Sequence, residues 1–199
     1  MEIVLASSNK GKIAELSAML APLEIAVRSP KDFPGWPEVE ETGKTFAENA
    51  VLKADAGCRF TGLSTVADDS GLVVEELDGA PGVFSARFAG LQANPHDNNC
   101  LLLKKLENVP SERRRAKFVC ALAYKIPGRE ARIFSGETYG RILTAPRGNE
   151  GFGYDPLFFS DDLQCSFAEA GAEAKNRVSH RGRALQQLIE YLGSIGDKK

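Results

Sequence analysis

The chain has 199 residues, of which 43% are hydrophobic and 26% charged, and its formal net charge is -2. This length suits one well-packed domain and is short for two, so we expect residues 1–199 to form a single domain. The near-neutral charge excludes the broad basic surface of a nucleic-acid-binding protein, so an anionic ligand would need a local cluster of Lys and Arg.

The chain also lacks the patterns of exported and membrane proteins. We find no basic segment followed by a long apolar core at the N-terminus, and no apolar run of membrane-spanning length. The four cysteines stand far apart without CxxC spacing, which favours reduced core thiols over a metal site or a disulfide framework. These features predict a cytoplasmic protein.

The first half of the chain is predicted to alternate strands and helices. Residues 2–6 are typical of a buried strand, and residues 11–21 have helical spacing with Ser8 or Asn9 as N-cap and Pro22 as the stop. Residues 29–44 predict a loop, and residues 45–59 predict a second helix. Strands at 64–67 and 72–77 are expected around a turn, "DDSG", followed by a loop at 79–96 and a helix at 97–107.

The second half begins with residues 116–126, which are apolar on both faces as in a central strand, and residues 131–139 are expected to be its hairpin partner. A glycine-rich loop at 144–155 precedes a short strand, "PLFF". Ser166 and Glu169 predict a capping box on a short helix. Leucines and an isoleucine at 185, 188, 189 and 192 predict a final helix with Ser179 as N-cap. The class is therefore α/β with a mixed sheet.

The stretch "SSNKGK" at 7–12 lies between the first strand and the first helix. It is not a Walker A loop, because Ile13 follows Lys12 and no glycine precedes the stretch. A helix N-terminus nevertheless offers unpaired N–H groups and partial positive charge to an anion. A capped helix with solvated lysines explains the same residues.

Two acidic stretches could supply metal ligands. "EVEETGKTF" at 38–46 precedes the second helix, and "VADDSGLVV" at 66–74 places two aspartates at the end of an apolar strand. Burying adjacent carboxylates is costly unless a cation is nearby, and Mg²⁺ takes oxygen ligands. The alternatives are an acidic loop favoured by the helix dipole and an Asp-capped turn. A serine-hydrolase elbow is not supported, since Asp68 stands where its first glycine should be.

Two later stretches could contact a nucleoside. In "GNEGFGYDP" at 148–156, glycines allow close approach of the backbone and Phe152 or Tyr154 could stack on a base. In "AKNRVSHRGRAL" at 174–185, His180 and Arg181 begin the final helix, where cations are unfavourable unless an anion or a carbonyl-rich ligand offsets them. Each stretch also has a purely structural explanation, but together they suit a nucleoside triphosphate with Mg²⁺.

Five stretches in this order resemble the inosine triphosphate pyrophosphatase family, which includes the bacterial dITP/XTP pyrophosphatases. They are "LASSNKGKIAEL", "EETGKTFAENAVLKA", "ADDSGLVVEELDGAPGVFSARFAG", "GFGYDPLFF" and "KNRVSHRGRAL", and they span Leu5 to Leu185. Ser7 stands where many members have Thr, and "AGAEAKN" replaces a more acidic run.

The resemblance implies Mg²⁺-dependent hydrolysis of non-standard purine nucleoside triphosphates, namely ITP, dITP and XTP, to the monophosphate and pyrophosphate. It also implies an elongated α/β fold of two lobes around a long mixed sheet with flanking helices. The active site would lie in the cleft between the lobes, and the protein would be a homodimer.

The resemblance also assigns site residues. Asp69 would be the catalytic group that activates water, and Glu40 and Asp69 the metal ligands, with Glu41 as the second choice to Glu40. The remaining residues would bind substrate: Ser7, Ser8, Asn9, Lys10, Gly11, Lys12, Ser70, Phe152, Gly153, Tyr154, Asp155, Lys175, His180 and Arg181. Apart from the resemblance, the charge pattern predicts that Lys53, which shares a helix face with Asn49, also binds phosphate.

Two other functions remain open from the sequence. A Maf-like nucleotide pyrophosphatase would share fold and product but prefer other nucleotides. A nucleotide-binding regulator would not need Glu40 and Asp69 together. The expected reaction is attack of water on the α-phosphorus with pyrophosphate leaving, and His180 and Arg181 would donate to the 6-oxo group of the base.

Overall fold

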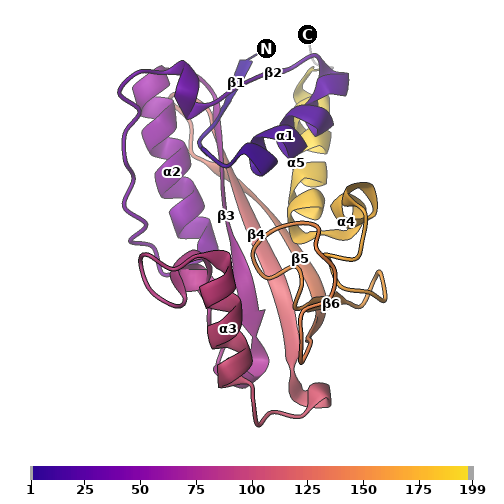
Figure 1. The fold of residues 1–199 in the computed structure, drawn as a ribbon. Coiled ribbons are helices and arrows are strands. Elements are labelled where there is room, and N and C mark those ends of the chain that lie inside the picture. Colours follow the sequence, from indigo (N-terminus) through magenta and orange to yellow (C-terminus); the bar gives the residue numbers. More distant parts are fainter. Residues whose placement is uncertain (1, 197–199) are drawn as a thin grey trace. The chain divides into compact units, whose positions relative to one another are not determined.

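The computed structural model describes residues 2–196 (Figure 1). Its strands and helices are, in chain order, β1 Glu2–Leu5, α1 Lys10–Leu20, β2 Ala26–Arg28, α2 Phe46–Thr61, β3 Thr65–Val74, α3 Pro95–Lys105, β4 Arg115–Lys125, β5 Arg132–Ile142, β6 Phe158–Ser160, α4 Ala172–Val178 and α5 His180–Gly196. Because strands and helices alternate along the chain, the predicted α/β class is confirmed.

The strands form one six-stranded sheet in the order β2-β1-β3-β4-β5-β6. β1 runs parallel to both β2 and β3, with Val4 opposite Thr65, whereas β5 and β6 are antiparallel. The sheet is therefore mixed, as predicted, and β4 is an interior strand next to β5.

The chain divides into two compact units, each built from separate segments. Unit 1 comprises residues 1–69, 120–135 and 184–199, and unit 2 comprises residues 70–119 and 136–183. The divisions fall inside β3, β4, β5 and α5, so these elements contribute residues to both units. Asp69 is the last residue of its unit 1 segment, and Ser70 is the first residue of unit 2.

Unit 1 packs helices on its strands through two different apolar surfaces. Large side chains of α1 and α5, including Leu16, Leu20 and Leu188, pack with Ile3 and Leu122 of the strands. A second cluster consists of alanines from α2, β3 and β4: Ala50, Ala54, Ala67, Ala121 and Ala123. Such small side chains allow a helix to lie close to the strands, which places the polar face of α2 beside Asp69 in the middle of β3.

Unit 2 has a core rich in aromatic residues. Phe118, Phe158 and Phe167 contact one another, with ring centroids 4.7 to 5.9 Å apart, and Leu102 of α3 belongs to the same cluster. Arg114 is buried here and donates hydrogen bonds to the carbonyl oxygens of Leu106, Val109 and Leu143. These carbonyl oxygens compensate the buried positive charge of the Arg114 guanidinium.

The prediction of a turn at "DDSG" is wrong, because β3 continues through it from Thr65 to Val74. Asp68 and Asp69 are buried in this strand and each forms an ion pair with a lysine. Opposite charges compensate the cost of burying carboxylates, which pattern alone does not reveal.

The predicted short helix at Ser166 is also absent. The side chains and amides of Ser166 and Glu169 form the two hydrogen bonds of a capping box, at 2.8 and 3.1 Å. These bonds close a turn instead, and α4 begins only at Ala172. Four residues can satisfy a capping box locally without the longer run that stabilises a helix.

The expectation of four core thiols holds for two of them. Cys58 and Cys120 are buried, whereas Cys100 is exposed on α3 and Cys165 is intermediate, and none of the four is in a disulfide. Cys100 is exposed because its position on α3 points away from the Leu102 core face. No helix within residues 2–196 has the length and apolarity needed to span a membrane.

Candidate functional site

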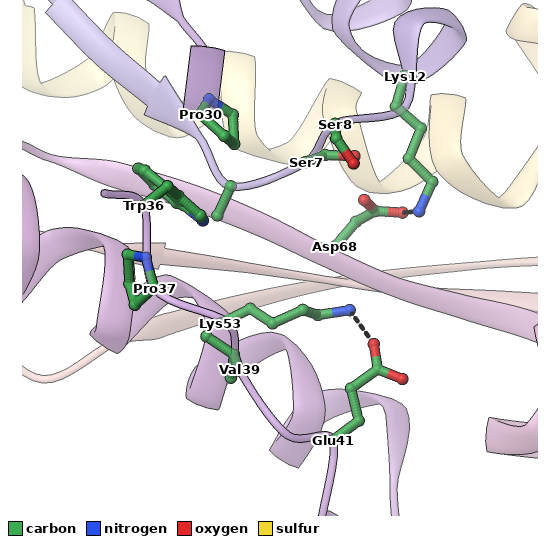
Figure 2. Close-up of a pocket in the computed structure, with 11 residues that line it drawn as sticks. Ser7, Ser8, Lys12, Pro30, Trp36, Pro37, Val39, Glu41, Lys53 and Asp68 are labelled. Carbon is green, nitrogen blue, oxygen red and sulfur yellow. Dashed lines mark hydrogen bonds and ion pairs between the residues drawn. The ribbon is translucent and has the colours of Figure 1, made fainter. Parts of the chain in front are cut away.

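A pocket in unit 1 brings together residues from three of the predicted stretches (Figure 2). Its volume is about 320 Å³. It is lined by Ala6, Ser7, Ser8, Lys12, Pro30, Trp36, Pro37, Val39, Glu41, Lys53 and Asp68. The "SSNKGK" stretch, the acidic stretch before α2 and Asp68 of β3 therefore meet at this pocket.

The start of α1 is organised by Asn9. Its side-chain oxygen accepts hydrogen bonds from the amides of Gly11 and Lys12, at 2.9 and 3.3 Å, so Asn9 is the N-cap. Two of the amides expected to meet an anion therefore already have a partner. The groups turned toward the pocket are Ser7, Ser8 and the Lys12 ammonium.

Lys12 Nζ lies 2.8 Å from Asp68 Oδ2, and the Asp68 side chain is 3% exposed (Figure 2). The pair links α1 to β3 across the pocket. No role could be predicted for Asp68 from the sequence, because the sequence does not show which of two adjacent aspartates faces which lysine. Alternation along β3 sends Asp68 and Asp69 to opposite faces of the strand.

Lys53 of α2 joins two carboxylates. Its ammonium lies 2.9 Å from Glu41 Oε1 and 2.9 Å from Asp69 Oδ1. The buried amide of Asn49, one turn earlier on α2, donates to Asp69 Oδ2 at 3.3 Å and accepts from the Gly43 amide at 2.8 Å. The sequence showed that Asn49 and Lys53 share a helix face, but not that both contact Asp69.

Burial of Asp69 raises its pKa above the ordinary value for a carboxyl group, although the Lys53 charge and hydrogen bond oppose this shift. Burial alone would lower the pKa of Lys53, but attraction to Asp69 and Glu41 exceeds it and raises that pKa. Lys53 is therefore a cation held between two carboxylates, and Asp69 is a carboxylate whose proton affinity is higher than usual.

Glu41 and Asp69 are the side chains beside Lys53 that could hold a divalent cation. Glu41 and Asp69 present oxygens within hydrogen-bonding distance of one nitrogen, so a cation can contact both. Within the described part of the chain, no three His, Cys, Asp or Glu side chains gather as a metal-binding group. Mg²⁺ commonly takes one or two carboxylates and completes its shell with waters and substrate phosphates.

Unit 2 contains a second polar cluster, made of Phe152, Asp155, Lys175 and Arg181. Lys175 Nζ lies 2.6 Å from Asp155 Oδ2, with both side chains under 10% exposed, and it also lies 4.8 Å from the centre of the Phe152 ring. Asp155 Oδ2 additionally accepts from the Phe152 amide at 2.8 Å. Gly151 has φ +80°, and a Cβ there would lie 2.2 Å from this oxygen, so the loop requires glycine.

The first turn of α5 completes the unit 2 cluster. Arg181 donates to Ser70 Oγ at 3.2 Å, and its guanidinium lies 5.7 Å from the centre of the Phe152 ring. The buried His180 ring is nearly parallel to Phe118, with centroids 4.8 Å apart. Ser179 Oγ accepts from the Gly182 amide at 3.0 Å, as an N-cap should. The exposed face of Phe152, which is 45% accessible, is the flat apolar surface of this cluster.

Three predicted site residues lie elsewhere or are not described. Glu40 is exposed, whereas its neighbour Glu41 faces Lys53. Tyr154 belongs to the core of unit 2 and donates its hydroxyl to the Ser85 carbonyl at 2.8 Å, so its ring is not on a pocket surface. The side chain of Lys10 lies outside the part that the structure describes.

Comparison with known proteins gives consistent matches along the whole chain. The chain is 53% identical to a dITP/XTP pyrophosphatase of Geobacter sulfurreducens over 98% of each protein. It is 50% identical to a dITP/XTP pyrophosphatase of Geobacillus kaustophilus, over 98% of this chain and 95% of the relative. The structure of a HAM1 protein from Coxiella burnetii has a TM-score of 0.91 and 42% identity, covering 98% of this chain and 99% of that one.

The model of the Ham1 family matches residues 3–191. This range contains both the unit 1 pocket and the unit 2 cluster. The chain belongs to the Ham1 family.

Proposed function

We propose that this protein hydrolyses non-standard purine nucleoside triphosphates, namely dITP, ITP and XTP, to the monophosphate and pyrophosphate. The observation that carries the proposal is the set of lysines and carboxylates in unit 1, where Lys53 joins Glu41 to Asp69 and Lys12 pairs with Asp68. Such alternation of charge suits a polyanion that arrives with a divalent cation. The names of the Geobacter and Geobacillus relatives support the purine specificity.

Within this function, Glu41 and Asp69 would hold Mg²⁺, and the exposed Glu40 would not. Mg²⁺, when bound, supplies positive charge to the phosphate oxygens. Asp69 accepts a proton from the attacking water, as a general base does. Asn49 holds the second oxygen of Asp69, so the basic oxygen keeps a fixed direction.

The remaining residues bind and orient the substrate. Ser7, Ser8, Lys12 and Lys53 would contact the triphosphate. Ser70, Phe152, Asp155, Lys175, His180 and Arg181 would bind the nucleoside. The unit 2 cluster offers a ring for stacking and cations that donate hydrogen bonds, which suit the 6-oxo group of hypoxanthine and xanthine. Adenine has an amino donor at that position and leaves such donors unpaired.

Two further features belong to this proposal. We expect a homodimer, and the exposed Phe84 and Leu91, at 58% and 86% accessibility, are apolar side chains that such an interface could cover. We also expect a cytoplasmic location, because the substrate comes from the cell's nucleotide pool and none of the four cysteines is in a disulfide.

The test is a product assay with Mg²⁺ and, separately, dITP, ITP, XTP, GTP, ATP and dUTP. We expect pyrophosphate from the first three and little from the others. Orthophosphate as product, or equal use of all six nucleotides, would contradict the proposal.

Asp69→Asn should reduce turnover of dITP roughly 100- to 10,000-fold, because the proton acceptor is lost while the size of the side chain is kept. The matched control is Asp78→Asn, an exposed aspartate after β3 whose φ of +51° asparagine also adopts readily. Normal turnover in Asp69→Asn would show that another group activates water.

A further inference from the structure

An aromatic side chain, that of Trp36, packs the segment before α2 against that helix. Trp36 packs edge-on against Phe60, with ring centroids 5.9 Å apart, and contacts Phe33 at 6.1 Å. Its ring also covers Gly57 so closely that a Cβ there would lie 2.9 Å from Cη2 of the indole. Alanine normally stabilises a helix interior relative to glycine by about 1 kcal/mol, so the bare backbone at Gly57 is explained by the ring that lies on it.

Trp36 is the first of three contacts along one face of α2. Gly57, Lys53 and Asn49 are successive positions four residues apart, and they face Trp36, the Glu41 carboxylate and the Gly43 amide respectively. The segment from Trp36 to Gly43 therefore runs antiparallel to roughly 12 Å of helix. Figure 2 shows Trp36, Pro37, Val39 and Glu41 following one another along the segment, with Lys53 directed at Glu41.

These contacts fix the distance between Glu41 and Asp69. Two side chains of α2, Lys53 and Asn49, hold the Asp69 carboxylate in place. Glu41, in contrast, lies on an irregular segment outside the helices and strands. At the Gly43 end the anchors are backbone hydrogen bonds to α2, from the Gly43 amide to Asn49 and from the Lys44 amide to Glu48. At the other end it is the packing of Trp36, which also lines the unit 1 pocket beside Pro37 and Val39.

We propose that Trp36 is a positioning residue for the metal carboxylates: its packing on Gly57 and Phe60 sets the place of Glu41 relative to Asp69. The inference rests on the proposed function only in naming Mg²⁺ as the cation that both carboxylates hold. Groups that orient metal ligands typically alter metal affinity roughly 10- to 100-fold when they are lost.

The first test measures Mg²⁺ binding without any nucleotide, through the rise of Tm with Mg²⁺ concentration. Trp36→Ala should shift the half-saturating Mg²⁺ concentration upward roughly 10-fold, and Trp36→Phe should restore most of the affinity, because phenylalanine keeps a ring over Gly57. Leu103→Ala, which trims a partly buried side chain in the core of unit 2, is the control for general loss of stability. It should lower Tm without moving the Mg²⁺ midpoint.

The second test moves the ring instead of removing it. Trp36 is the only tryptophan of the chain, so its emission reports its own packing. Gly57→Ala should shift that emission to the red and raise the half-saturating Mg²⁺ concentration together. A red shift with unchanged Mg²⁺ binding, or Trp36→Ala with a wild-type Mg²⁺ midpoint, would overturn the inference. Failure of the proposed function would appear differently, as absence of pyrophosphate release by the unmodified protein.

Discussion

At the scale of single residues, the most consequential contact is that of Lys53 with two carboxylates. The Lys53 side chain is 17% exposed, and its ammonium compensates the charges of Glu41 and Asp69. Burial of Asp69 favours its neutral form, and Lys53 limits that tendency. Removing the lysine would leave two nearby carboxylates without their cation, which a metal ion could replace.

We therefore predict that Lys53→Met lowers the free energy of unfolding by about 3 kcal/mol in EDTA, since breaking one partner of a buried pair is costly. Mg²⁺ should raise the free energy of unfolding of Lys53→Met by more than it raises that of the unmodified protein. Chemical denaturation with and without Mg²⁺ measures both effects.

The control for this variant is Lys125→Met. Lys125 is 19% exposed and pairs with Asp55 at 3.2 Å, so it matches Lys53 in burial but contacts neither Glu41 nor Asp69. The decrease in the free energy of unfolding of Lys125→Met should be the same with and without Mg²⁺. An equal response of both variants to Mg²⁺ would place the cation elsewhere.

Arg181 allows a second prediction at this scale. It contacts both Ser70 and the Phe152 ring, which places its charge beside the flat surface proposed for the base. Arg181→Ala should reduce kcat/KM for ITP more than for ATP, because only ITP offers the 6-oxo acceptor. An equal reduction for both nucleotides would indicate that Arg181 contacts phosphate.

At the scale of elements, the beginning of α1 has two roles that compete. Asn9 caps the helix through the Gly11 and Lys12 amides, and the same helix end is proposed to face the triphosphate. A cap that already uses these amides leaves the serine hydroxyls and the Lys12 ammonium as the groups available to phosphate oxygens. Stability and substrate binding should therefore respond differently to substitutions of Asn9.

Asn9→Ala should lower the free energy of unfolding by about 1 kcal/mol, because the cap is lost. Asn9→Asp should keep the stability, since aspartate caps equally well, but raise KM for dITP through repulsion of the triphosphate. Thermal unfolding and steady-state kinetics on both variants separate the roles. If KM is the same in Asn9→Asp and the unmodified protein, the start of α1 does not contact the triphosphate.

At the scale of the whole molecule, two compact units share one sheet but have separate cores. The unit 1 cores are aliphatic and alanine-rich, and the unit 2 core is rich in phenylalanine. The four cysteines differ in burial between the two units. Cys58 and Cys120 are buried in unit 1, whereas Cys100 is exposed and Cys165 is intermediate in unit 2.

Thiol labelling of the native protein should accordingly give a fast reaction at Cys100 and a slower one at Cys165. Cys58 and Cys120 should react only when the protein unfolds, because their sulfurs are covered by the packing of unit 1. Mass spectrometry of peptides after timed labelling identifies each site. Rapid labelling of Cys120 in the native state would contradict the described core.

Many local features could be predicted from the amino-acid sequence. Apolar spacing located most strands and helices, including α5, because these patterns reflect one buried face per element, but it missed β2 and α4 and divided β3 in two. The residues before the first helix identified Asn9 as a candidate N-cap. The charged stretches that resemble the family could also be recognised, because their residue types and order are visible in the sequence.

Only the tertiary structure decided how distant residues combine. It showed that β3 passes straight through "DDSG", because Lys12 and Lys53 arrive from two different helices to neutralise Asp68 and Asp69. It also distinguished Glu41 from Glu40 and placed Trp36 on Gly57. These outcomes depend on which side chain faces which partner across tens of residues, and spacing along the chain carries no information about that.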